Sequence, residues 1–166
     1  MPTMTLQIPT EDGKADAFAA YPDGGGQHPG VLLYMDIFGV RPVLEEMARE
    51  LAGHGYYVLV PNVFYRRGPA PLVELPEHIG AEARPTVFSR LKPLMEEHTP
   101  ERVLRDADAY LGFLAGRPEV GAGPVAVVGY CMGAALAMRT AGAPPKRVAT
   151  PARLHPQYPG PRRPDS

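Results

Sequence analysis

The stretch that decides the fold is Val125-Ala126-Val127-Val128-Gly129-Tyr130-Cys131-Met132-Gly133. It begins with four aliphatic residues, a run typical of a strand that is buried on both faces of a sheet. An alanine-rich segment at residues 134–141 follows it and predicts a helix. Strand, sharp turn and helix thus follow one another without a linker, which indicates an α/β fold with a candidate nucleophile at the turn.

The glycines of this stretch have a steric explanation. Gly129 and Gly133 lie two residues before and two residues after Cys131, where the backbones of a strand and a helix approach closely. We expect Cys131 to project from the carboxyl edge of the sheet, where the N–H groups of a helix start favour a thiolate and an oxyanion. A buried structural cysteine in a glycine-bounded turn is the alternative interpretation.

The rest of the sequence up to residue 141 repeats the alternation of strands and helices. Apolar runs at residues 31–35 and 56–60 flank a helix that begins near Pro42, a right-handed βαβ arrangement. A weakly alternating hairpin precedes them. The predicted elements are strands at residues 3–8, 15–21, 31–35, 56–60 and 125–128, and helices at residues 42–52, 84–98, 100–114 and 134–141. The fold class is therefore α/β, with a mostly parallel sheet and flanking helices.

A second candidate feature is Asp36-Ile37-Phe38-Gly39, at the end of the first inner strand. In this architecture the loop after that strand supplies one backbone N–H to an oxyanion, and the residue after the nucleophile supplies another. Those donors would be Ile37 and Met132. Asp36 has an alternative interpretation as a helix-capping or turn residue only.

Composition divides the chain near residue 142. Residues 1–142 carry 12 basic and 17 acidic groups, whereas residues 143–166 carry five basic groups and one acidic group. The second segment also holds seven of the 21 prolines, which remove backbone donors from helices and inner strands. We predict a domain over residues 1–141 and an irregular Pro/Arg-rich tail over residues 142–166.

Several functional classes are disfavoured by composition. The formal net charge of −1 provides no basic field for nucleic acid or an anionic membrane. Met1 to Asp12 lacks the pattern of a signal peptide, and the apolar runs are too short to span a membrane. One cysteine cannot form an internal disulfide or a cysteine-based zinc site, which favours a reducing cytoplasm. Neither phosphate-binding glycine motif follows a strand, so a nucleotide-binding domain is a weak alternative.

Taken together, these motifs resemble the dienelactone hydrolase family of α/β-hydrolases over residues 3–141. The resemblance rests on the stretch around Cys131, on Asp36-Ile37-Phe38-Gly39, and on Gly55-Tyr56-Tyr57-Val58-Leu59-Val60-Pro61-Asn62 with Tyr65 after it. It implies hydrolysis of ester or lactone bonds in small molecules, of the carboxymethylenebutenolidase type, without a cofactor or a metal. Members of this family open a dienelactone to maleylacetate.

The resemblance also assigns roles to four residues. Cys131 matches the family nucleophile, and Met132 and Ile37 match the backbone donors of the oxyanion hole. Asp36 stands where the family usually has a glutamate that contacts the resting thiol.

The candidate triad departs from the family. The family order is nucleophile, acid and histidine, but His155 and Asp165 are the only histidine and aspartate after Cys131, and their order is reversed. His155 is therefore expected to be an exposed tail residue. The four earlier histidines occur in turn or helix-end contexts that do not suit a triad base; they are His28, His54, His78 and His98.

We therefore expect a family member that is truncated or frameshifted after about residue 141, without the C-terminal strands. The alternative function is a catalytically inactive family member or a non-catalytic fragment. Candidate substrate-binding arginines are Arg66, Arg67 and Arg84, although solvated surface charge is the favoured interpretation of all three. The sequence specifies neither the natural substrate nor the oligomeric state.

Overall fold

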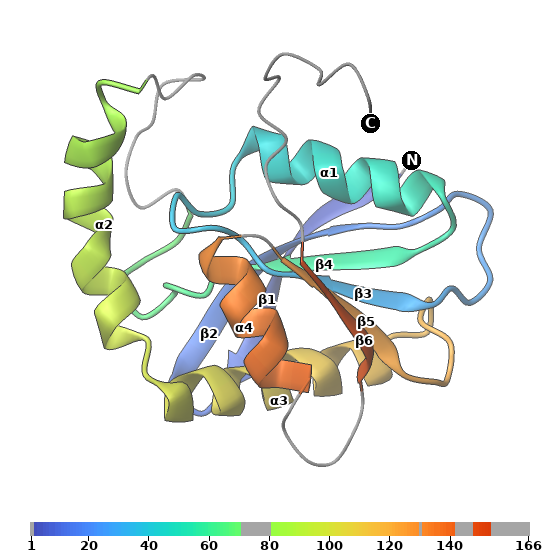
Figure 1. The fold of residues 1–166 in the computed structure, drawn as a ribbon. Helices are drawn as coiled ribbons and strands as arrows, with labels where there is room; N and C mark the ends of the chain where they lie inside the picture. Colours follow the sequence, from blue (N-terminus) through green and yellow to red (C-terminus); the bar gives the residue numbers. More distant parts are fainter. Residues whose placement is uncertain (1, 71–80, 130, 142–147, 154–166) are drawn as a thin grey trace, which may run out of the picture.

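The computed structural model describes residues 2–70, 81–129, 131–141 and 148–153. In these residues a six-stranded sheet has the order β1-β2-β4-β3-β5-β6 (Figure 1). The strands are β1 (Thr3–Thr10), β2 (Gly13–Ala20), β3 (Gly30–Leu33), β4 (Tyr57–Pro61), β5 (Val125–Gly129) and β6 (Val148–Arg153). The helices are α1 (Pro42–Gly53), α2 (Arg84–Glu97), α3 (Pro100–Ala115) and α4 (Met132–Ala141).

The three central strands β4, β3 and β5 are parallel and apolar, as the sequence predicts. β3 pairs in parallel with both β4 and β5, and every residue of β3 and β4 is buried. Continuous burial follows from helices on both faces of a parallel sheet. β1 and β2 form the predicted antiparallel hairpin, and β2 continues the sheet antiparallel to β4.

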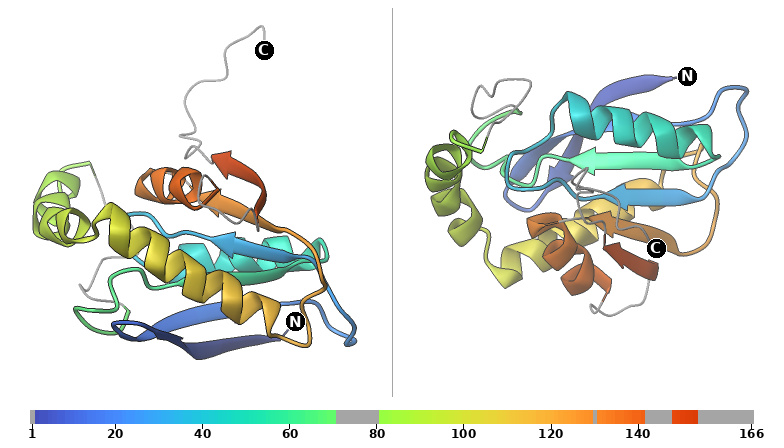
Figure 2. Two further views of the ribbon diagram at one scale, coloured as in Figure 1. Left: turned by 90° about the horizontal axis from the view of Figure 1, so that it is seen from below. Right: turned by 45° about the horizontal axis from the view of Figure 1, so that its top comes forward.

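The helices form two layers around the sheet. α1 covers one face, and α3 and α4 lie on the opposite face (Figure 2). α1 begins at Pro42, where a missing N–H costs nothing, and buries Leu44, Ala48 and Ala52 along one stripe. α3 begins after Thr99, whose side-chain oxygen accepts a hydrogen bond from the Arg102 N–H at 3.4 Å.

One strand lies inside the segment that was expected to be irregular. Residues 148–153 form β6, which pairs in parallel with β5 and includes Pro151 opposite Val127. Proline is tolerated there because β6 is an edge strand, where an N–H is needed on one side only. The prediction of an irregular tail is therefore wrong for residues 148–153, and one further strand follows the helix after Cys131. Residues 142–147 and 154–166 lie outside the described part.

The parallel strands bring three loops to one edge of the sheet. β3, β4 and β5 run in the same direction, so the segments after them leave from the same edge (Figure 1). The Tyr34 N–H donates to the Val128 carbonyl oxygen at 2.8 Å, which extends the pairing of β3 and β5 to this edge. The two sequence motifs, after β3 and after β5, are neighbours for that reason.

Candidate active site

Cys131 lies at the sharp turn between β5 and α4. Its φ angle is 58°, and among the described residues it is the only non-glycine with a positive φ. Left-handed backbone at such a residue is strained and persists only where the surrounding structure imposes it. Cys131 forms no disulfide, and the residue is exposed to solvent. Exposure excludes the interpretation of Cys131 as a buried structural cysteine.

The two glycines around Cys131 allow backbones to approach within contact distance. A Cβ on Gly129 would lie 2.3 Å from the Gly133 carbonyl oxygen. A Cβ on Gly133 would lie 2.7 Å from the Met35 carbonyl oxygen and 2.8 Å from that of Tyr34. The start of α4 is therefore packed directly against the chain that leaves β3.

Two backbone N–H groups at this junction have no partner in the described part of the chain. Neither the Ile37 N–H nor the Met132 N–H donates to a protein acceptor there. Met132 begins α4, where the first N–H groups of a helix carry partial positive charge. Ile37 follows β3 in the loop against which Gly133 packs. Free donors on these two segments suit an oxyanion that forms beside Cys131.

Asp36 is buried and bound to Arg41. Arg41 Nη1 donates to Asp36 Oδ1 at 2.6 Å, and Arg41 Nη2 donates to Asp36 Oδ2 at 3.0 Å. Asp36 Oδ1 also accepts the Phe38 N–H at 3.1 Å, so the turn interpretation of Asp36 describes part of its role. No hydrogen bond joins Asp36 to Cys131 within the described residues. Sequence reasoning missed Arg41, although its position directly before a helix-starting proline marks it as part of this loop.

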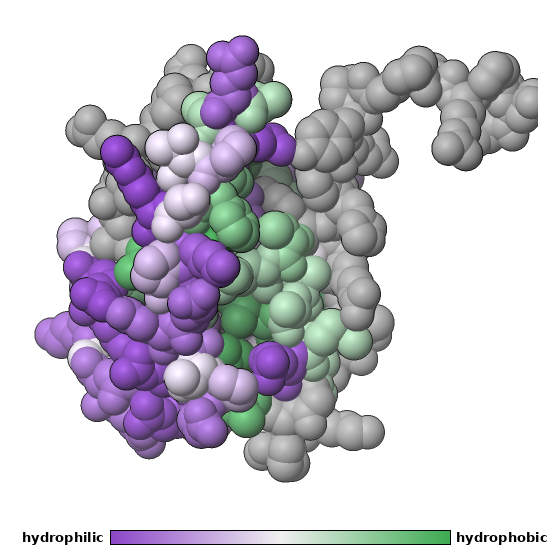
Figure 3. All heavy atoms as spheres, turned by 60° about the vertical axis from the view of Figure 1, so that its left-hand side comes forward, coloured by the Kyte–Doolittle hydropathy of each residue, from purple (hydrophilic) through white to green (hydrophobic). Residues whose placement is uncertain are grey.

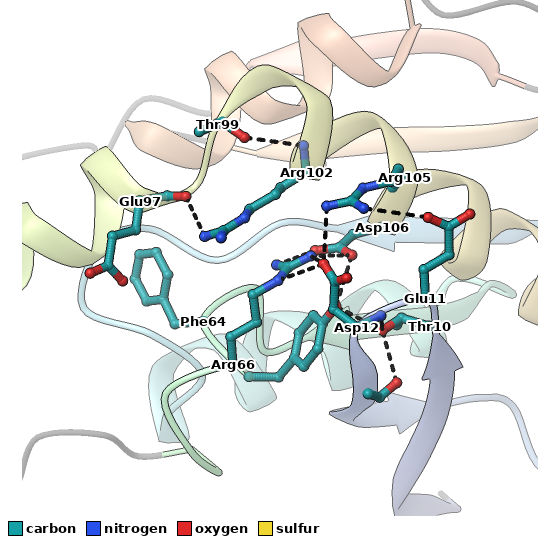
Figure 4. A network of polar contacts seen from close by, with 12 residues as sticks. Thr10, Glu11, Asp12, Phe64, Arg66, Glu97, Thr99, Arg102, Arg105 and Asp106 are labelled. Atoms are coloured by element: carbon teal, nitrogen blue, oxygen red, sulfur yellow. Dashed lines mark hydrogen bonds and ion pairs between the residues drawn. The ribbon is translucent and has the colours of Figure 1, made fainter.

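The candidate arginines differ from one another. Arg66 binds the buried carboxylate of Asp106 through two hydrogen bonds of 2.8 and 3.0 Å, and it also binds Asp12 (Figure 4). Arg67 forms an exposed ion pair with Glu97. The prediction of a solvated surface charge is therefore wrong for Arg66. Arg84 lies at the exposed start of α2.

The sequence carries a signal for Asp106, the partner of Arg66 that was not predicted. Asp106 falls on the apolar stripe of α3, between Val103 and Tyr110, and its side chain is 2% exposed. A carboxylate at a core position requires a charged partner. Spacing along the helix thus identifies Asp106 as a buried acid, but it does not identify Arg66 as its partner.

Of the three histidines in the described part of the chain, His98 has the most strongly shifted pKa. Burial lowers its pKa to about 4, with the nearby Asp106 opposing the shift. Its ring packs edge-on against Phe64, at a centroid distance of 6.4 Å, and its Nδ1 has no partner among the described atoms. His28 binds the Gly25 carbonyl oxygen, and His54 follows α1. His78, His155 and Asp165 lie outside the described residues.

Neither a metal centre nor a membrane span is indicated in the described residues. No group of three or more histidine, cysteine, aspartate or glutamate side chains there is arranged to hold a metal ion. None of the helices in that part is long and apolar enough to cross a membrane.

Comparison with known proteins identifies relatives of the same kind. Residues 15–165 match the sequence model of the dienelactone hydrolase family. A carboxymethylenebutenolidase of Pseudomonas sp. (strain P51) is 31% identical over 116 residues, which are 70% of this chain and 45% of the relative. A putative carboxymethylenebutenolidase of Methylorubrum extorquens is 29% identical over 128 residues, 77% of this chain and 40% of the relative.

The fold has solved counterparts as well. A putative dienelactone hydrolase from Klebsiella pneumoniae superposes with a TM-score of 0.72 at 23% identity, covering 94% of this chain and 62% of that chain. This likeness supports the α/β architecture described above. The chain spans less than half the length of each of these two curated relatives.

Proposed function

This chain belongs to the dienelactone hydrolase family, a family of hydrolases, and we propose that it hydrolyses ester or lactone bonds of small molecules with Cys131 as the nucleophile. The observation that carries the proposal is an exposed cysteine thiol held at a φ of 58° between β5 and α4. Strain at one exposed nucleophilic residue is characteristic of functional sites.

The proposed reaction has two steps. The Cys131 thiolate, its proton lost to solvent, attacks the carbonyl carbon, and the carbonyl oxygen becomes an oxyanion bound by the Ile37 and Met132 N–H groups. The carbon–oxygen bond then breaks, and the leaving alkoxide takes a proton from water. Water finally hydrolyses the thioester and restores the thiol.

The activity assay uses the purified 166-residue chain with an activated aryl ester and an enol lactone. Cys131→Ala is the control, and intact mass confirms the C-terminus. Turnover that disappears in Cys131→Ala is the expected result. Equal rates in both proteins would contradict a role for Cys131 as nucleophile.

The second candidate is a catalytically inactive family member. One observation favours it: within the described residues, no hydrogen bond joins a histidine to Cys131. A folded chain that shows no turnover of either substrate would support this candidate. Turnover would contradict this candidate, and His155→Gln would then test whether the tail histidine contributes a base.

The proposed compartment and substrate class follow from the single cysteine and the net charge of the chain. A nucleophilic thiol must stay reduced, and the single cysteine suits a reducing compartment such as the cytoplasm. The near-neutral net charge supports a small-molecule substrate rather than nucleic acid.

A further inference from the structure

We propose that Arg41 is a positioning residue for the hydrolysis proposed above: through Asp36 it holds the loop that presents the Ile37 N–H. The inference rests on the proposed function, because it assigns the Ile37 N–H to the oxyanion. Its basis is a set of contacts within residues 36–41.

The guanidinium of Arg41 closes this loop by three hydrogen bonds. Two of them form a fork on Asp36, at 2.6 and 3.0 Å, and the third runs from Arg41 Nη1 to the Gly39 carbonyl oxygen at 3.0 Å. Parallel N–H···O bonds of this kind fix the orientation of both partners as well as their separation. The Arg41 guanidinium also lies 5.5 Å from the centre of the Phe38 ring.

The backbone of the loop is fixed from the other side by Asp36. Its Oδ1 accepts the Phe38 N–H at 3.1 Å, and its carbonyl oxygen accepts the Gly39 N–H at 3.1 Å. Ile37 lies between these anchored residues, and its own side chain is 2% exposed. The direction of the Ile37 N–H therefore depends on the Asp36–Arg41 pair.

The same pair satisfies both carboxylate oxygens of Asp36. Both of its oxygens accept hydrogen bonds from Arg41, and the positive charge offsets that of the carboxylate. A cavity of about 180 Å³ borders Arg41, with Asp16 and Glu45 also in its wall. Open space on that side means that polar contacts, more than packing, keep Arg41 in place.

The test compares two reactions of Cys131, which is the only cysteine of the chain. Iodoacetamide alkylates the thiolate by displacing iodide, and no oxyanion forms. p-Nitrophenyl acetate acylates the same sulfur through a tetrahedral oxyanion, releasing p-nitrophenolate and leaving an acetyl thioester that intact mass detects. The ratio of acylation rate to alkylation rate therefore reports oxyanion stabilisation separately from thiolate fraction.

Arg41→Ala and Asp36→Asn are each expected to slow acylation by about 10- to 100-fold, because the oxyanion donor is misplaced. The double variant is expected to be no slower than either single variant. The alkylation rate and its pH midpoint are expected to stay at wild-type values. Arg41→Lys, which keeps the charge but loses the fork, is expected to be intermediate.

Arg49→Ala is the matched control. Arg49 lies on α1, the helix that begins directly after Arg41. It is exposed and contacts the Phe18 ring rather than Asp36. Its removal is expected to leave both reactions unchanged.

Three outcomes would overturn the inference or its premise. Parallel loss of acylation and alkylation in Arg41→Ala would show that the pair acts on the thiol itself. Unchanged acylation in Arg41→Ala would show that the pair does not position the donor. Wild-type protein that is alkylated but never acylated would contradict the proposed function instead. Amide hydrogen exchange tests the loop separately. Faster exchange at Phe38 and Gly39 in Arg41→Ala, at an unchanged melting temperature, would support the role of Arg41 in holding the loop. Unchanged exchange would refute that role.

Discussion

Gly133 shows how little room the backbone has beside Cys131. An added Cβ would lie 2.7 Å from the Met35 carbonyl oxygen. This oxygen belongs to the backbone, so it cannot move aside as the end of a flexible side chain can. The left-handed backbone of Cys131 depends on the same close approach. Residues near Cys131 are thus constrained by backbone contacts rather than by side-chain packing.

Gly133→Ala is expected to lower the free energy of unfolding by about 1 to 3 kcal/mol, the usual cost of overpacking. Gly112→Ala is the matched control, because Gly112 lies within α3 and its Cβ would meet nothing within 4 Å. That substitution is expected to stabilise the chain by about 0.5 to 1 kcal/mol through helix propensity. Urea unfolding measures both. Equal effects would contradict the close approach of α4 to β3.

His98 predicts how stability depends on pH. Its pKa is lowered to about 4 in the folded chain, mainly by burial, from an ordinary value of 6.5. Between these pH values the unfolded chain binds more protons, so the free energy of unfolding decreases as the pH falls from 6.5 to 4. The contribution of His98 over this range is about 1 to 3 kcal/mol.

His98→Phe is expected to weaken this loss of stability at acidic pH, because phenylalanine does not take up a proton. Urea unfolding at pH 7 and pH 4 measures the difference. His54→Phe, at an exposed position after α1, controls for the loss of an imidazole. An unchanged difference between the two pH values in His98→Phe would contradict the prediction.

At the level of secondary-structure elements, a polar network joins the β1–β2 turn, the loop after β4 and α3 (Figure 4). Asp106 on α3 accepts hydrogen bonds from Arg66 and from the Tyr65 hydroxyl, the latter at 2.9 Å. Arg66 also binds Asp12 in the hairpin turn, and hydrogen bonds with both acids raise its pKa although burial opposes this. The hairpin is therefore attached to α3 by charged groups, of which Asp106 is buried and Asp12 is exposed.

Asp106→Asn is expected to destabilise the chain by about 1 to 3 kcal/mol, because Arg66 would lose its buried counter-charge but keep Asp12. The double variant Asp106→Leu with Arg66→Met removes both charges and is expected to be more stable than Asp106→Asn. Urea unfolding of the single and double variants measures this. A double variant that is no more stable than Asp106→Asn would contradict the mutual dependence of Asp106 and Arg66.

For the molecule as a whole, β6 covers an edge that would otherwise be open. It supplies the outer partner of β5, the strand that ends at the candidate nucleophile. An apolar area lies beside a hydrophilic one on the side that carries α2 and α4 (Figure 3). The exposed side chains of α4 include Ala135 and Met138, which is 42% exposed. An open β5 edge beside this helix would favour association.

Deletion of residues 142–166 is therefore expected to lower the melting temperature and to produce soluble oligomers or aggregates. A chain that ends at residue 153 keeps β6 and is expected to remain in the oligomeric state of the full chain. Size-exclusion chromatography with light scattering distinguishes the three proteins. If deletion at residue 141 left the size and melting temperature unchanged, β6 would contribute nothing to the sheet.

The elements and the turn at Cys131 were predictable from sequence because their signals are local. Aliphatic runs specify β3, β4 and β5, helical spacing specifies α1 and α3, and glycines at fixed distances mark the turn. Pairing between distant segments has no such signal. β6 contains a proline and was expected to be irregular, yet the open edge of β5 supplies its backbone partners.

What the sequence by itself determined is the order of strands and helices up to residue 141 and the identity of the nucleophile candidate, because each depends on neighbours in the chain. Only the tertiary structure decided which charges meet. Asp36 pairs with Arg41, the nearest basic residue in the sequence, but Asp106 pairs with Arg66 although Arg102 and Arg105 lie on its own helix. The physical reason is that an ion pair away from water depends on the distance and orientation of two side chains, which the packed fold sets.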